Sequence, residues 1–227
     1  MKNADLHGNV PDHSELALIL IDVINDMEFP EGEQLMQFAL PAAQRIKELK
    51  ERAYALSIPV IYVNDNFGRW RSDFKAQLQH CLEDEVRGRE IAALLHPKDD
   101  DYFVLKPKHS GFYSTELDTL LRYLRAETLI LTGFATNICV LFTANDAYMR
   151  DFELFVPADC VAANTRQEHD YALDQMRRIL KADVTSSEDL DITKLAEMTR
   201  RRMPKHLRME SGLYTQYRDY DRRKRAG

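Results

Sequence analysis

The chain contains few cysteines, and their spacing does not suit cross-links. Its 227 residues include three cysteines, Cys81, Cys139 and Cys160. An odd number of cysteines without C-x-x-C spacing argues against a disulfide framework and against a zinc knuckle. At least one thiol is therefore expected to stay free.

Long apolar runs are also missing. The segment from Met1 to Ser14 mixes charged residues with Gly8 and Pro11 and has no apolar core of the kind that a signal peptide needs. No later run approaches the roughly 20 apolar residues of a membrane span. We therefore expect a cytoplasmic protein without a membrane partner.

No internal repeat, low-complexity run or Gly/Ser-rich linker divides the chain. A length of 227 residues suits one domain that buries about 70–75% of the surface exposed by its unfolded chain. Charge is uneven, however: residues 193–227 hold 11 Lys/Arg and 4 Asp/Glu, against 20 and 33 in residues 1–192. We expect one domain over residues 1–192 and a basic C-terminal extension over residues 193–227.

The charges of the two segments are opposite, +7 for the extension and −13 for the body. A basic segment can bind nucleic acid, but it can also lie on the acidic body of its own or a neighbouring subunit. The second arrangement accounts for both charges. We therefore expect no nucleic-acid partner.

Short apolar segments alternate with amphipathic ones. Leu16–Asp22 (LALILID) is a continuous apolar run, which is typical of a strand buried on both faces. Pro41–Leu56 repeats apolar residues at helical spacing, and Pro41 suits a first turn because its missing N–H costs nothing there. Similar patterns predict strands at 59–63, 102–105, 128–132, 153–157 and 182–185, and helices at 114–125, 138–150 and 167–180.

Apolar strands linked by helices form a mostly parallel sheet that is covered on both sides. We therefore predict an α/β fold, a three-layer, doubly wound, mostly parallel six-stranded sheet with helices on both faces. Ligands of such sheets bind beyond the carboxyl ends of the strands. Asp22 and Lys106 follow predicted strands, and Cys139 lies at the entrance of a predicted helix. These three side chains are expected to converge.

The position of Cys139 suggests how its thiol would be activated. Gly133 and Ala135 allow a tight turn that places the sulfur near a helix N-terminus, where the dipole favours the thiolate. The same turn directs backbone N–H groups at one point, as an oxyanion requires. Asp22 could take the thiol proton while Lys106 stabilises developing negative charge.

Each of these three residues also has a simpler interpretation. A free cysteine usually packs as a small hydrophobe. An aspartate after a strand often caps a turn, and a lysine there is usually solvated. None of the three identifies the chemistry by itself.

Taken together, three ordered motifs resemble the isochorismatase-like cysteine hydrolase superfamily. They are LILIDVINDM around Asp22, VLKPKHSGF around Lys106 and TGFATNICV around Cys139, and the likeness covers residues 14–190. The resemblance implies a catalytic triad of Asp22, Lys106 and Cys139. It also implies a hydrolase that cleaves the C-N bond of a small amide or ureide through a thioester and needs no cofactor.

Further details of the site follow from the same resemblance. Lys106 is preferred to Lys108 as the catalytic lysine because it directly follows the strand and matches the spacing of the family motif. The family has a non-proline cis peptide, which here would join Phe134 to Ala135. The amides of Ala135 and Cys139 would then form the oxyanion hole.

One feature of the nicotinamidase branch is missing from the sequence. That branch has an aspartate followed closely by histidines after the second strand, whereas the segment here is NDNFGRWRSDF. Asp65 has no histidine nearby, the next being His80, so we expect no metal. His109, close to Lys106, is expected to be solvated and is given no role.

Polar and aromatic residues beside the motifs are candidates for substrate binding. They are Phe29, Asn66, Phe67, Trp70, Phe112, Tyr113 and Asn137. Aromatic residues beside an active loop are often anchors of that loop instead, so adjacency is the only argument for them.

Two alternatives to amide hydrolysis stay open. One is hydrolysis of an isochorismate-like vinyl ether, with Asp22 as the acid and Cys139 as a bystander. The other is a non-catalytic binding or assembly module with the same fold. The expected partners are a small-molecule amide substrate and further copies of the chain, since most relatives in the superfamily form dimers or tetramers.

Overall fold

The computed structural model describes residues 14–66 and 73–202. Their strands form one six-stranded sheet. The order of five strands is β3-β2-β1-β4-β5, and β6 pairs with the end of β4. Every pair of strands is parallel. The strands are β1 (Leu16–Ile21), β2 (Val60–Asp65), β3 (Tyr102–Lys106), β4 (Thr128–Phe134), β5 (Glu153–Phe155) and β6 (Val161–Ala162). The predicted doubly wound α/β class is confirmed.

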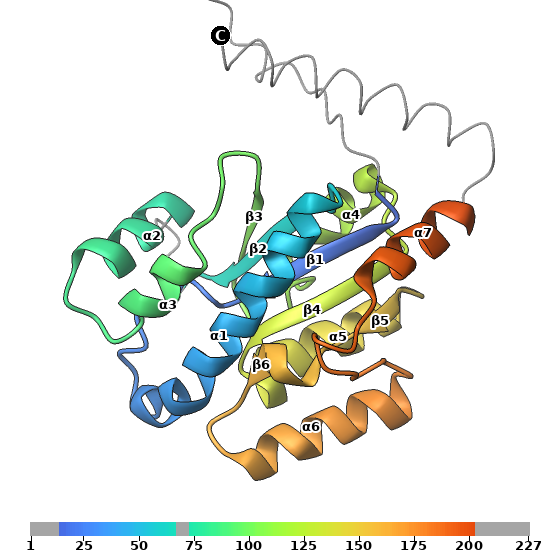
Figure 1. The fold of residues 1–227 in the computed structure, drawn as a ribbon. Helices are drawn as coiled ribbons and strands as arrows, with labels where there is room; N and C mark the ends of the chain where they lie inside the picture. Colours follow the sequence, from blue (N-terminus) through green and yellow to red (C-terminus); the bar gives the residue numbers. More distant parts are fainter. Residues whose placement is uncertain (1–13, 67–72, 203–227) are drawn as a thin grey trace, which may run out of the picture.

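Helices cover both faces of the sheet, as Figure 1 shows. One face carries α1 (Gly32–Ala55), α2 (Phe74–Glu83), α3 (Arg89–Leu94) and α7 (Ile192–Arg202). The other carries α4 (Leu117–Leu124), α5 (Leu141–Tyr148) and α6 (Arg166–Ile179). Because side chains alternate along a strand, the leucines of β1 enter the first core while Ala17, Ile19 and Ile21 enter the second. This is why the apolar run of β1 is continuous.

The sixth strand is not the predicted one. Only a single bridge, between Phe155 and Asp183, forms in the segment 182–185. The Asp183 carboxylate accepts a hydrogen bond from the Thr185 amide, which turns the chain away from the sheet. Residues Val161 and Ala162 supply the sixth strand instead by pairing with Gly133 and Phe134.

Helix α1 is longer than predicted. It begins at Gly32, so Pro41 lies inside the helix and not in its first turn. The buried stripe of α1 already starts at Leu35 and Ala39, and this packing against the sheet outweighs the missing proline N–H. Helices α2, α3 and α7 were not predicted.

Helix α7 crosses the predicted boundary at residue 192. Its residues Leu195 and Ala196 are buried in the first core, so the start of the basic extension packs against the sheet domain. Residues 203–227 lie outside the described part of the chain. Within the described residues, no helix has the length and apolarity needed to cross a bilayer.

The ends of β1 and β4 approach each other closely at the carboxyl edge of the sheet. Gly133 pairs with Ile21, and its φ of +108° lies in a region that side chains rarely adopt. A Cβ added at Gly133 would lie 2.0 Å from the Ile21 carbonyl oxygen. The end of β4 can therefore lie directly beside Asp22 only if residue 133 is glycine.

The variant Gly133→Ala should lose stability. Both the strained backbone and the clash with Ile21 add to the cost, and we expect the free energy of unfolding to fall by more than about 3 kcal/mol. Urea denaturation followed by circular dichroism measures this. A loss below about 1 kcal/mol would show that the two strands separate easily.

A buried lysine lies on the first face of the sheet. Lys50 of α1 is 3% exposed, and its ammonium donates to the Tyr62 hydroxyl (3.1 Å) and to the His96 carbonyl (2.9 Å). Burial lowers the pKa of Lys50 to about 8, although nearby carboxylates such as Asp101 oppose the shift. Folding therefore disfavours the charged form of this side chain.

This lowered pKa predicts a rise of stability with pH. Above pH 8 the folded protein releases the Lys50 proton while the unfolded chain still binds it up to its ordinary pKa of 10.5. Between pH 7 and 10, wild type should gain about 2 kcal/mol relative to Lys50→Met, measured by urea denaturation of both proteins. A difference that does not change with pH would contradict the lowered pKa.

Candidate active site

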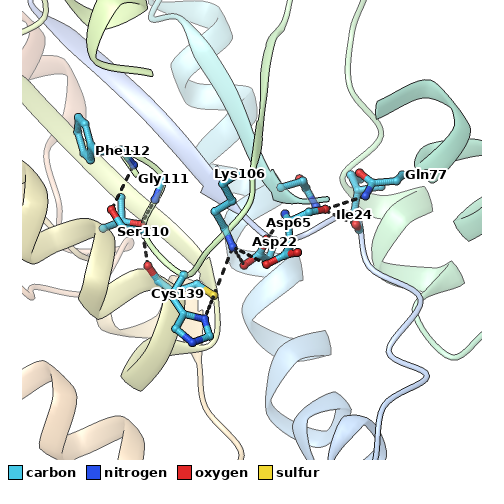
Figure 2. Close-up of polar contacts among 12 residues, drawn as sticks. Asp22, Ile24, Asp65, Gln77, Lys106, Ser110, Gly111, Phe112 and Cys139 are labelled. Carbon is cyan, nitrogen blue, oxygen red and sulfur yellow. Dashed lines mark hydrogen bonds and ion pairs between the residues drawn. The ribbon is translucent and has the colours of Figure 1, made fainter. Parts of the chain in front are cut away.

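Three polar side chains meet at the carboxyl edge of the central strands. Strand register aligns Ile21 with Val63 and Asp65 with Lys106, so β1, β2 and β3 end close together. Asp22 follows β1 directly. Figure 2 shows the side chains of Asp22, Asp65 and Lys106 turned toward one another.

Lys106 is the centre of this group. Its side chain is fully buried, and its Nζ lies 2.8 Å from Asp22 Oδ2 and 3.3 Å from Asp65 Oδ2. The same Nζ is 3.5 Å from Cys139 Sγ. Lys108, by contrast, is exposed. The structure thus brings the three predicted residues Asp22, Lys106 and Cys139 together.

The backbone fixes the orientation of Asp22. Its φ of +53° is in the left-handed region, and its amide donates to the Val63 carbonyl at 2.9 Å. Its Oδ1 accepts the Asp65 amide at 2.6 Å. One carboxylate oxygen therefore binds the β2 backbone while the other faces Lys106.

Cys139 lies in a short π-helical turn, η2 (Thr136–Val140), which leads from β4 into α5. Its carbonyl accepts the Thr143 hydroxyl at 2.7 Å, and the Thr143 oxygen accepts the Gly111 amide at 3.0 Å. These bonds connect the turn to the loop that follows Lys106. The relative position of the thiol and the ammonium is thereby fixed from two sides.

Burial and charge set the protonation of the three groups. Burial raises the pKa of the Asp22 carboxyl, and Lys106 only partly offsets this. Burial also raises the pKa of the Cys139 thiol; Asp22 raises it further, while Lys106 opposes it. Burial alone would lower the pKa of Lys106, but Asp22, Cys139 and Asp65 outweigh it and the pKa is raised.

The prediction that a helix dipole favours the thiolate is therefore wrong for the resting site. Cys139 lies within a five-residue π-helical turn, and burial beside the carboxylate of Asp22 keeps its thiol protonated. The Asp22 carboxylate, which contacts the same Lys106 ammonium as the thiol, is the neighbouring group that could accept its proton.

Sequence reasoning missed two residues of this site. Asp65 was considered only as a metal ligand, yet its carboxylate binds Lys106 and its carbonyl accepts Gln77 Nε2 at 2.7 Å. His109 was given no role, yet its Nδ1 lies 3.8 Å from Cys139 Sγ. Asp65 is the last residue of β2 as Lys106 is of β3, and this position at a strand end could have identified it.

The predicted substrate contacts differ in position. Asn66 is buried, and its backbone N–H donates to the Lys106 carbonyl at 3.0 Å. Phe29 is half-buried against the first core. Tyr113 is 56% exposed. Asn137 Oδ1 is buried without a hydrogen-bond partner among the described residues. Phe67 and Trp70 lie outside the described residues.

Phe112, one of the predicted substrate contacts, lies in the second core. Its ring is buried in the second core against Phe152, and the Arg150 guanidinium lies 4.8 Å from the ring centre. Figure 2 shows the ring pointing away from Cys139. Phe112 is thus an anchor of its loop because it has a deep apolar site available, which adjacency in sequence does not reveal.

The turn around the predicted oxyanion donors has a distinctive backbone. The Phe134–Ala135 peptide is cis, at the position that the resemblance implied. The amides of Ile138 and Val140 both donate to the Ala135 carbonyl at 3.1 Å. The role of the Ala135 and Cys139 amides as an oxyanion hole stays a prediction.

A groove of about 560 Å³ lies apart from the thiol, along α1 and the segment from η3 (Ala158–Cys160) to the start of α6. None of Asp22, Lys106 and Cys139 lines it. One residue of its lining, His169, has its Nδ1 3.1 Å from Oγ1 of Thr136, in the turn that carries Cys139. In residues 14–66 and 73–202, His, Cys, Asp and Glu side chains form no cluster suited to a metal ion.

Known proteins are similar to this chain in sequence and in fold. A family model described as the isochorismatase domain matches residues 16–189. An uncharacterized isochorismatase family protein, YaaI of Bacillus subtilis (strain 168), is 43% identical over 177 residues, which are 78% of this chain and 97% of that protein.

Two further similarities involve amidohydrolases. Ureidoacrylate amidohydrolase RutB of Methylorubrum extorquens is 46% identical over 65 residues, or 29% of this chain and 26% of that protein. The crystal structure of N-carbamoylsarcosine amidase from Thermoplasma acidophilum is 28% identical with a TM-score of 0.60, covering 78% of this chain and 99% of that one. With a matched domain that spans most of its length, the chain belongs to the isochorismatase family of hydrolases.

Proposed function

We propose that this protein is a cysteine-dependent amidohydrolase that cleaves the C-N bond of a small amide or ureide. The observation that carries the proposal is the contact of one buried ammonium, Lys106 Nζ, with both the Asp22 carboxylate and the Cys139 thiol. A base, a nucleophile and a cation in mutual contact are the groups that acyl transfer needs.

Acylation begins with proton transfer from Cys139 to Asp22. The raised pKa of Asp22 makes its carboxylate a stronger base than an ordinary aspartate, and both side chains contact Lys106 Nζ. Sγ then attacks the substrate carbonyl carbon. Lys106 stays protonated because its pKa is raised, so its charge stabilises the anionic sulfur as the proton leaves.

Collapse of the tetrahedral intermediate breaks the C-N bond as an acid of the site protonates the nitrogen, which departs as the amine while the acyl group stays on Sγ. Water then attacks the thioester and returns a proton to that acid, and Sγ recovers its proton from Asp22. The amides of Ala135 and Cys139 are the proposed donors to the oxyanion in both steps. No cofactor takes part in this scheme.

The similarities support an amide or a ureide as the substrate class. One relative is named a ureidoacrylate amidohydrolase, and one similar structure is that of an N-carbamoylsarcosine amidase. Residues of the pocket other than the triad, including Asn66, Tyr113 and Asn137, would select among such substrates. We further propose that the protein acts as a homo-oligomer.

A vinyl ether of the isochorismate type is the second candidate substrate. The domain that matches this chain is named after isochorismatase. In that reaction Asp22 would act as an acid and Cys139 would not form a bond. Release of pyruvate, without ammonia or amine, would identify this chemistry.

The first test is ammonia release from a panel of small amides and ureides, nicotinamide included. Wild type should hydrolyse at least one of them, and Cys139→Ala should lose more than about 10³-fold in kcat because the acyl acceptor is gone. Cys160→Ala is the matched control, since Cys160 is a free thiol buried in the first core and has no role in the proposed reaction. Equal turnover by wild type and Cys139→Ala would sink the thiol mechanism, and silence across the panel would favour the vinyl ether or a binding module.

The variant Asp22→Asn separates the acidity of the thiol from catalysis. The Asp22 carboxylate raises the pKa of Cys139 and Lys106 lowers it, so removing the carboxylate charge should lower that pKa. We expect the pH profile of Cys139 alkylation by iodoacetamide to move down by at least about one pH unit, while amide turnover falls by about 10²-fold or more. A profile that moves up, or turnover that survives, would contradict the role of Asp22.

A further inference from the structure

A further titratable side chain lies beside Cys139. His109 Nδ1 is 3.8 Å from Cys139 Sγ. Lys106 is fully buried and Asp22 nearly so, whereas His109 is exposed. The sulfur is thus bounded by an ion pair on its inner side and by an imidazole on its open side.

The position of His109 is fixed by its surroundings. Its ring lies against Phe142 of α5, with 5.4 Å between ring centres. The loop that carries it is held to the same helix, because the Gly111 amide donates to Thr143 Oγ1, whose hydroxyl in turn donates to the Cys139 carbonyl. Loop and nucleophile are therefore positioned by the same bonds.

Amide hydrolysis requires a proton donor for the leaving nitrogen, and the buried groups are poorly placed to be that donor. An amine leaves a tetrahedral intermediate readily only when its nitrogen is protonated as the bond breaks. Asp22, which holds the former thiol proton, has its oxygens turned to Lys106 Nζ and to the Asp65 amide at the inner side of the site. A proton donor on the open side would reach a nitrogen that departs outward.

We propose that His109 is a further catalytic residue, which protonates the leaving nitrogen during acylation. This inference rests on the proposed amide hydrolysis. The reaction starts with Asp22 ionised, Cys139 as a thiol and His109 as an imidazolium. Asp22 accepts the thiol proton, Sγ bonds to the carbonyl carbon, and the His109 proton passes to nitrogen as the C-N bond breaks.

Deacylation restores these protonation states. Neutral His109 accepts a proton from the attacking water, whose oxygen bonds to the acyl carbon. The C-S bond breaks, and Sγ takes its proton from Asp22. One water is consumed, one acid and one amine are released, and all three side chains return to their initial forms.

The experiment compares His109→Gln with wild type on substrates that differ in their leaving groups. Three measurements are made on each protein: ammonia release from the best amide of the panel, the first-turnover burst of p-nitrophenolate from p-nitrophenyl acetate, and alkylation of Cys139 by iodoacetamide. The burst reports acylation alone, and the phenolate and the iodide leave without a proton, whereas an amine must be protonated to leave. His96→Gln is the matched control, because His96 is exposed and its ring Nδ1 lies 2.8 Å from the Pro97 carbonyl.

We expect His109→Gln to lower amide kcat by about 10²-fold or more while the rate of the ester burst and the rate of alkylation stay within about threefold of wild type. His96→Gln should match wild type in all three. Equal losses in amide turnover and in the ester burst would show a structural role and overturn the proposal, as would full amide turnover by His109→Gln. If His109→Gln keeps full amide turnover while Cys139→Ala loses it, the role of His109 is wrong but the amidohydrolase proposal stands. If wild type itself hydrolyses no amide, both proposals are wrong.

Discussion

The buried ion pair between Lys106 and Asp22 is the constraint on which the rest of the site depends. An ammonium and a carboxylate removed from water lose several kcal/mol of hydration each, and only close contact repays this. The 2.8 Å separation, together with Asp65 at 3.3 Å, meets that requirement. It does so only because β1, β2 and β3 end at the same edge of the sheet.

The same burial sets the chemical state of the nucleophile. A thiol beside a carboxylate in a buried site resists ionisation, so Cys139 rests as a thiol and Asp22 as its ready acceptor. The proposed reaction therefore begins with proton transfer from the thiol to Asp22.

Hydrogen bonds between segments far apart in the chain hold the lysine and the cysteine in position. The turn of Cys139 joins the lysine loop through Thr143 and Gly111, and the cysteine turn follows β4 where Gly133 lies against Ile21. The cysteine turn is therefore held by the sheet on one side and by the lysine loop on the other. Phe112, which lies in the second core away from the thiol, anchors that loop.

Much of the fold and part of the site were predictable from local patterns. The continuous apolar run of β1 and the ordered motifs around Asp22, Lys106 and Cys139 predicted the parallel sheet and the three groups at its carboxyl edge. The short strand Val161–Ala162 and the early start of α1 could not be read in this way, because each depends on packing against a distant segment.

By itself, the sequence determined the α/β class and the position of most strands, since periodicity is a local property, and its ordered motifs indicated Asp22, Lys106 and Cys139 as a group. Only the tertiary structure decided which groups touch: Asp65 against Lys106, and His109 against the sulfur. It also decided that the thiol rests protonated. Contact distances and desolvation arise when residues far apart in the chain share one buried space, and no local pattern encodes that.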